Sequence, residues 1–144
     1  MGYRQDAIDT IFGTFRTYWL ANAPAPIPPI TWQDIPYDPP DDCAAWVRAS
    51  ALHNEADLAS IGAQSTRKWR TEGRVWIQIF TRLGDGRSPS DALVEVAIGA
   101  FRGKSAGTNP CVAFREAKAQ EVGPEGAWFM QTVSFQFMYD ENAV

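Results

Sequence analysis

Hydrophobic positions near the beginning of the chain recur at the spacing of a helix. The positions i, i+3, i+4, i+7 and i+11 are filled by Ile8, Ile11, Phe12, Phe15 and Trp19. In a helix these side chains share one face, so the pattern predicts an amphipathic helix over about residues 4–21, with an aromatic stripe that packs on a sheet. Four prolines between residues 23 and 29 end this helix, because proline lacks a backbone donor.

The period changes to two in the middle of the chain. Residues 45–53 and 75–80 alternate, and the second segment is apolar on both faces, as in a central strand. Between them, residues 54–65 are polar and have no clear period, which predicts a projecting loop or arm. Residues 66–74 form a basic segment that is broken near Gly73, before the central strand begins.

The second half of the chain carries one capped helix and one long strand. Ser88 is suited to cap the helix, Pro89 fits its first position, and Asp91 favours the positive end of the helix dipole. Gly103 follows the last apolar position and is typical of a helix end. Alternation over residues 129–139 then predicts the longest strand.

The last strand is expected to form a hairpin with the strand before it. That preceding strand begins at Val112, and residues 122–127 carry the turn. With a short strand at residues 30–35, the element order is α-β-β-β-α-β-β. Two helices and alternating strands predict a two-layer α+β domain, in which both helices pack on a mostly antiparallel sheet. A length of 144 residues and a hydrophobic fraction of 45% fit one domain over residues 1–144.

Residue types that carry catalysis or bind metals lack the necessary spacing. Cys43 and Cys111 are far apart without a CxxC motif, and His53 is a single histidine outside any metal-ligand pattern. Residues 84–86 lack the sequence of a phosphate-binding loop and indicate a strand-to-helix turn. We therefore expect no catalytic site, cofactor or metal, and a protein that is not an enzyme.

Charge and hydropathy argue against nucleic acid and membranes as the main partners. The chain has 13 Lys and Arg against 17 Asp and Glu, and its net charge of −4 argues against a dedicated nucleic-acid-binding protein. The N-terminal residues lack the apolar region of a signal peptide, and no segment approaches the roughly 18 apolar residues of a membrane span. We expect a protein that is made in the cytoplasm and has no membrane partner.

One local cluster combines basic side chains with tryptophans, and it consists of Arg67, Lys68, Arg70 and Arg74 around Trp69 and Trp76. Such a cluster can bind single-stranded nucleic acid, but on an acidic chain a salt-bridged contact with a neighbouring subunit is the favoured interpretation. The expected interface residues come from this cluster, from an acidic proline-rich loop and from one strand end, and they are His53, Arg67, Lys68, Trp69, Arg70, Asp41 and Asp42.

Short motifs follow one another in a characteristic order along nearly the whole chain. They are Tyr18-Trp19-Leu20, Ile30-Thr31-Trp32, Trp46-Val47-Arg48, Gly73-Arg74-Val75-Trp76-Ile77-Gln78-Ile79-Phe80, Gly84-Asp85-Gly86, Gly126-Ala127-Trp128-Phe129 and Phe135-Gln136-Phe137-Met138-Tyr139. In this order the chain resembles the phage tail terminator family, which comprises the lambda-type tail completion proteins and their relatives in prophages and gene transfer agents.

The resemblance implies a virion structural protein without catalytic residues. It implies a sheet flanked by helices, and a hexameric ring at the head-proximal end of the tail tube. Such a ring stops tube polymerisation and joins the tail to the head-tail connector or stopper. Its partners would be further copies of this chain, the major tail tube protein and the connector, and DNA would only pass through the lumen.

Two other functions stay open at this point. The first is a head-tail stopper or another neck protein, which also forms rings. The second is a soluble ligand-binding α+β domain, with an aromatic pocket that Trp32, Trp46, Trp76 and Trp128 could line.

Overall fold

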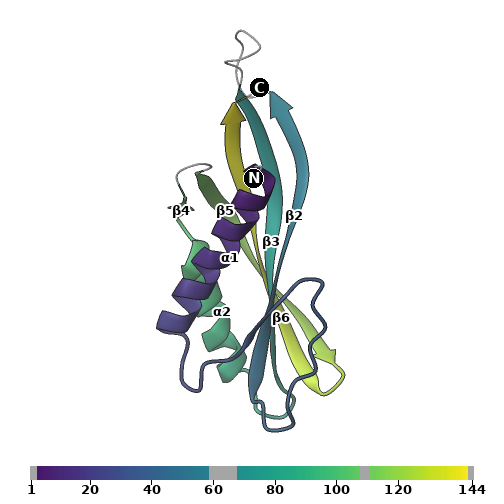
Figure 1. Ribbon diagram of the computed structural model, residues 1–144. Helices are drawn as coiled ribbons and strands as arrows, with labels where there is room; N and C mark the ends of the chain where they lie inside the picture. The colour runs from purple at the N-terminus through teal and green to yellow at the C-terminus, as the bar shows by residue number, and fades with distance from the viewer. Residues whose placement is uncertain (1–2, 59–67, 108–110, 143–144) are drawn as a thin grey trace.

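A computed structural model describes residues 3–58, 68–107 and 111–142 of the chain. It contains one six-stranded sheet with two helices on one of its faces (Figure 1). The elements are α1 (Tyr3–Asn22), β1 (Ile30–Trp32), β2 (Ala45–Leu58), β3 (Lys68–Arg82), α2 (Ser88–Phe101), β4 (Ser105–Ala106), β5 (Val112–Glu125) and β6 (Trp128–Asn142). The predicted α+β class and element order are confirmed, with the two-residue β4 as the one additional strand.

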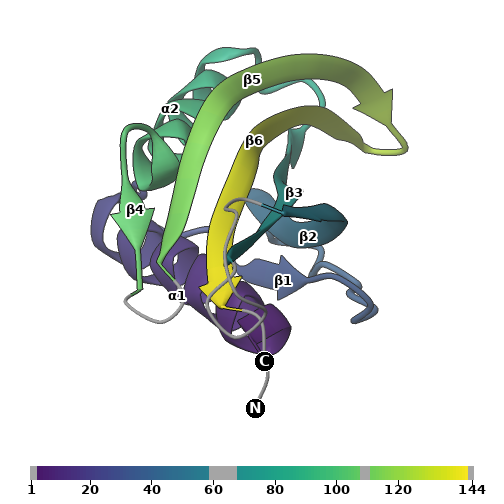
Figure 2. The same ribbon diagram turned by 90° about the horizontal axis from the view of Figure 1, so that it is seen from above.

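The strands lie in the order β1-β2-β3-β6-β5-β4. Strand β1 runs parallel to β2, and every other neighbouring pair is antiparallel. The hairpin of β5 and β6 is confirmed, and β6 also pairs with β3 along its whole length, from Lys68 opposite Asn142 to Arg82 opposite Trp128. Figure 2 shows β6 lying between β3 and β5, with α1 and α2 both on one side of the sheet.

The aromatic stripe of α1 is the centre of the helical layer, as its spacing predicts. Ile11, Phe15 and Trp19 are completely buried, whereas Phe12 is half-buried at the border of the core. The ring centroid of Phe15 lies 6.1 Å from that of Phe101, so it joins the two helices. Trp19 also donates a hydrogen bond of 2.9 Å from its indole Nε1 to the carbonyl of Pro28, which fixes the proline connector against α1.

The predicted arm differs from the structure in two ways. Residues 54–58 are the end of β2, and β3 begins at Lys68 and continues through Gly73 without a break. The prediction of a break was wrong because this part of β3 is held extended by pairing with β2 on one side and β6 on the other. The ends of β2, β3 and β6 project beyond the helices (Figure 1). The rest of the predicted arm, residues 59–67, lies outside the described residues.

Both ends of α2 are defined by the residues that flank it. The residue before the helix is Arg87, whose side chain makes no capping hydrogen bond, so the prediction of Ser88 as the cap is wrong by one position. Ser88 and Pro89 are the first two helical residues instead. At the other end the chain leaves the helix at Arg102, and Gly103 follows with a φ of 67°. This left-handed conformation agrees with the predicted helix end.

Strand β5 is longer than its sequence indicates. It continues to Glu125, so the turn of the hairpin is confined to residues 126–127. Its register against β6 shifts between Arg115 and Lys118 and again between Glu121 and Gly123. These irregularities interrupt the alternation of side chains, which explains why the sequence pattern predicts only the beginning of the strand.

Candidate functional site

The predicted basic cluster lies at the projecting end of β3, and its charge is partly neutralised within the chain. Arg70 forms a two-point ion pair with Asp140 on β6, with distances of 2.9 and 3.1 Å. The hydrogen bonds and charge of Asp140 raise the pKa of Arg70. Trp69 is 36% exposed and is the large apolar group at this end. Arg67 and the side chain of Lys68 lie outside the described residues.

His53 makes its main contacts inside the molecule. Its Nε2 lies 3.0 Å from the hydroxyl of Tyr139, and its ring meets the edges of Phe137 and Tyr139. Burial, followed by the positive charge of Arg4, lowers the pKa of His53 from its ordinary value of 6.5. These contacts give the half-buried imidazole a structural role between β2 and β6, and its role at an interface stays a prediction.

Asp41 and Asp42 lie in an exposed turn at the other end of the sheet. Ala45 pairs with Thr81 and Leu58 pairs with Trp69, so the full length of β2 separates this turn from the basic cluster. Arg82 donates hydrogen bonds to the carbonyls of three residues of the loop, Pro40, Asp41 and Cys43. The predicted interface residues that the structure describes therefore lie at two ends of the sheet and do not form one site.

We call residues 33–44 the acidic loop. Its carboxylates are Asp34, Asp38, Asp41 and Asp42, all of them exposed. The ring of Tyr37 packs at 5.1 Å from that of Trp46, which places the loop over one end of the sheet face that points away from the helices. This contact and the hydrogen bonds from Arg82 give the loop a defined position.

We call the sheet face that points away from the helices the open face. Its side chains alternate with the core residues along β2, β3, β5 and β6. Near one end, Trp46 stacks on Phe80 with ring centroids 4.0 Å apart, and Trp128 meets Trp46 edge-on. Arg82 lies over the ring of Trp128 at 4.1 Å. This end of the open face is therefore an aromatic surface.

The middle of the open face is basic, a feature that the sequence analysis missed except for Arg74 of the predicted basic cluster. Four cations are spread over this part of the face, and we call them the basic patch: Arg48 on β2, Arg74 on β3, and Arg115 and Lys118 on β5. They come from three strands, so no run of charges reveals them. The one available signal is the alternation of β2 and β3, which places Arg48 and Arg74 on positions that face away from the core, whereas the register shift between Arg115 and Lys118 hides the two cations of β5. The Nε of Arg48 is buried and has no hydrogen-bond partner.

The four tryptophans that could line a ligand pocket do not share one surface. Trp32 packs against Phe12 of α1 at 4.9 Å, on the helical side of the sheet. Trp46 and Trp128 lie on the open face, where they contact each other. Trp76 also lies on the open face, so only Trp32 is separated from the other three tryptophans.

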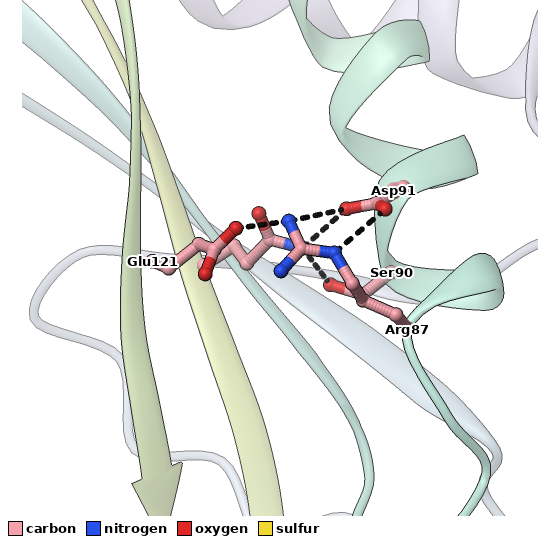
Figure 3. Close-up of polar contacts among 5 residues, drawn as sticks. Arg87, Ser90, Asp91 and Glu121 are labelled. Atoms are coloured by element: carbon pink, nitrogen blue, oxygen red, sulfur yellow. Dashed lines mark hydrogen bonds and ion pairs between the residues drawn. The ribbon is translucent and has the colours of Figure 1, made fainter.

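A polar cluster joins the start of α2 to the sheet (Figure 3). The Nε2 of buried Gln131 donates hydrogen bonds to the Oγ of Ser90 at 2.6 Å and to Asp91 at 3.0 Å. Arg87 contacts both Asp91 and Glu121. These contacts lower the pKa of Asp91, through Gln131 first and then Arg87, and they lower the pKa of Glu121 through Arg87. The cluster orients a helix and has the character of a structural site.

The described residues also bear on metal binding and on membrane insertion. Within residues 3–58, 68–107 and 111–142, no group of three or more His, Cys, Asp or Glu side chains could hold a metal ion. The helices in this part of the chain are too short or too polar to cross a membrane.

Comparisons with known proteins give similarity in structure and not in sequence. No protein-family model and no curated protein matches the chain. One solved structure, of a protein whose name states no function, is 18% identical with a TM-score of 0.62, and the match covers 91% of this chain and 94% of that one. A chain from the virion of a native gene transfer agent particle is 17% identical with a TM-score of 0.45, with 93% and 92% covered. The first match shows that the α+β fold occurs in another protein.

Proposed function

We propose that this protein is a virion structural protein that acts as a tail terminator. Copies of the chain form a hexameric ring on the head-proximal end of the tail tube. The observation that carries the proposal is the order of motifs from Tyr18-Trp19-Leu20 in α1 to Phe135-Gln136-Phe137 in β6, which resembles the tail terminator family over nearly the whole chain.

The surfaces of the molecule support a role in assembly. A ring of identical subunits needs two different surfaces on each subunit, because each contact joins one surface to the other. This chain has several: the projecting end of β2 and β3, the acidic loop and the basic patch. The strongest polar clusters, around Gln131 and around Arg82, hold elements in place within the chain. We therefore propose a protein that binds its neighbours and catalyses no reaction.

The proposed partners follow from the position of such a ring. One surface of the ring would meet the major tail tube protein, and the opposite surface would meet the head-tail connector or stopper. The genome would pass through the lumen. We propose the end of the sheet around Trp69 for the tube contact, because this end of β3 projects beyond the helices and a partly exposed tryptophan is a common centre of binding energy.

Deleting the gene tests the proposal directly. A missing terminator leaves tube growth unlimited, so electron micrographs should show tails of irregular and excessive length. A gene copy supplied in trans should restore a uniform length. A head-tail stopper would give a different result, namely tails of normal length that are not attached to heads. Tails of normal length in the deletion strain would therefore contradict the terminator proposal.

A single substitution tests the proposed tube contact. Trp69→Ala removes an exposed ring, so the protein should stay folded and should bind purified tail tubes less tightly. Leu83→Ala is a matched control, because Leu83 is also exposed but lies at the opposite end of β3. Equal tube binding by the wild type and both variants would exclude Trp69 from the contact.

A further inference from the structure

The charges of this molecule are unevenly distributed over its surface. The chain is acidic overall, with a net charge of −4, yet the basic patch collects four cations on one face of the sheet. Gln136 pairs with Arg74 on one side and with Arg115 on the other, so these two arginines are two strands, or roughly 10 Å, apart. Similarly, Ser134 pairs with Trp76 on one side and with Lys118 on the other, so Lys118 is two strands away from a residue that lies two positions after Arg74 on β3.

Among the described side chains, most of the basic patch has no counter-charge in an ion pair. Glu72 is a carboxylate beside it, with one oxygen 3.7 Å from Arg115. In the described part of the chain, Arg48, Arg74 and Lys118 form no ion pair. Like charges that gather without counter-charges repel one another, and a partner of opposite charge relieves that repulsion.

The acidic loop has the complementary composition. Its four aspartates fall within residues 34–42, and no Lys or Arg occurs between residues 17 and 47. Within the described ranges, none of the four is in an ion pair. Three prolines and the hydrogen bonds from Arg82 already fix the loop, so little conformational entropy is lost when it binds.

Complementary charge favours a second copy of this chain over nucleic acid as the partner of the basic patch. The acidic loop lies on the same open face, where Asp34 and Arg48 line one shared depression. Its aspartates would repel a phosphodiester backbone that approached the patch, and the net charge of −4 adds to that repulsion. The acidic loop of another subunit meets less of this repulsion, because its few carboxylates lie on a short segment that can reach Arg74 and Lys118 without passing the aspartates beside Arg48, whereas a continuous phosphodiester backbone extends past both.

We infer that the basic patch of one subunit binds the acidic loop of the next. Arg74 and Lys118 are the central cations, and Asp38 and Asp41 are the central carboxylates. Because the two surfaces differ, the contact is heterologous and repeats from subunit to subunit, as a ring requires. The inference rests on the proposed ring, for which it names the subunit contact.

Charge reversal on either side provides the first test. The patch variant is Arg74→Glu with Lys118→Glu, and the loop variant is Asp38→Lys with Asp41→Lys. Each should weaken self-association about tenfold or more, measured by sedimentation at low salt and by the number of subunits on purified tail tubes. An equimolar mixture should regain association, because the two reversed surfaces match again. Arg16→Glu with Arg102→Glu changes the net charge as the patch variant does, at exposed sites elsewhere, and should have no effect.

A cross-linking experiment locates the contact without substitutions. A carbodiimide joins a lysine amine to a carboxylate when the two are in contact. In a mixture of nitrogen-15-labelled and unlabelled protein bound to tail tubes, Lys118 should be joined to an aspartate of the acidic loop, with one peptide labelled and the other unlabelled. The neutral patch variant, Arg74→Gln with Lys118→Gln, avoids new repulsion by Glu72 and should still lose self-association.

The outcomes separate this inference from the proposed function. Rings and tube capping that survive both charge reversals would overturn the inference and leave the terminator proposal intact. A wild-type protein that neither associates nor caps tubes would overturn both. Binding of a short DNA oligonucleotide that the patch variant loses, with self-association unchanged, would assign the basic patch to nucleic acid and overturn the inference.

Discussion

The ring of Phe137 lies over Gly73 where β6 pairs with β3. A β-carbon placed on Gly73 would lie 2.7 Å from Cε2 of that ring and still closer to its Cζ and to the backbone carbonyl of Leu52. The glycine therefore serves close packing between three strands. It does not interrupt the strand, because its missing side chain is replaced by the aromatic ring of the neighbouring strand.

Replacing this glycine should destabilise the fold. Gly73→Ala forces the carbonyl of Leu52 and the ring of Phe137 to move, and overpacking of this kind costs about 1–3 kcal/mol. The free energy of unfolding in urea measures the loss. Gly13→Ala is the control, because nothing lies within 4 Å of a β-carbon there. In the helix α1 that change should stabilise the protein by about 0.5–1 kcal/mol. A loss at Gly13 or none at Gly73 would contradict this account.

The two phenylalanines of the α1 stripe should contribute differently to the free energy of unfolding. Phe15 is completely buried between Trp19 and Phe101, so Phe15→Ala should cost about 3–5 kcal/mol of unfolding free energy. Phe12 is half-buried beside Trp32, and Phe12→Ala should cost clearly less. Urea melts of both variants give the comparison. Equal losses of unfolding free energy would mean that Phe12 and Phe15 are equally buried, which would contradict the structure.

Gln131 should couple energetically to Ser90. The buried amide donates to the Ser90 hydroxyl, so Ser90→Ala leaves a buried donor with one partner fewer and should cost about 1–3 kcal/mol. Gln131→Ala should cost at least as much, since it also removes the bond to Asp91. In a double-mutant cycle the second substitution should cost less once the first is present. Additive losses would show that the hydrogen bond contributes little.

Stability should depend on the charge of Asp91 at acid pH. Its pKa is lowered in the folded protein from an ordinary value of 3.8, so the unfolded chain takes up the proton first. The stabilisation is therefore complete above pH 3.8 and is lost as the pH falls through the lower pKa of the folded state. Asp91→Asn should reduce stability at pH 6, and its difference from the wild type should shrink below pH 3.8. A difference that does not vary with pH would exclude this linkage.

The single histidine should titrate below its ordinary pKa of 6.5. Protonation is disfavoured in the folded state, so the contribution of His53 to stability is present above pH 6.5 and declines as the pH falls through its lowered pKa. Imidazole resonances in NMR report the titration without overlap. Arg4→Gln removes the second cause of the shift and should bring the pKa part of the way back, while burial maintains the rest. A pKa at or above 6.5 would contradict the burial of this ring.

Local periodicity predicts the fold where one face of an element is buried without interruption. The stripe of α1 and the alternation of Val75, Ile77 and Ile79 are of this kind, and both are core in the structure. Periodicity fails at Gly73 and at the irregular positions of β5, because the neighbouring strand decides their conformation. Propensity and spacing within a segment contain no information about that neighbour.

The candidate site was less predictable than the fold. Asp41 and Asp42 were identified by composition, and the structure places them in a loop that Arg82 fixes. The basic patch could not be found in this way, since Arg48, Arg74 and Lys118 are brought together only by strand pairing. In the predicted basic cluster, sequence reasoning found the charge of Arg70 but missed its partner. Asp140, which neutralises Arg70, lies 70 residues away on another strand.

The position of β6 sets an order for folding during synthesis. This strand follows β3 and β5 in the chain, yet it pairs with β3 on one side and β5 on the other. While the ribosome has not yet released residues 128–142, the two halves of the sheet cannot join, and the unpaired edges of β3 and β5 are open to aggregation. The hydrophobic core is therefore completed late, and chaperones that shield strand edges should have the most effect on nascent chains that end before Trp128.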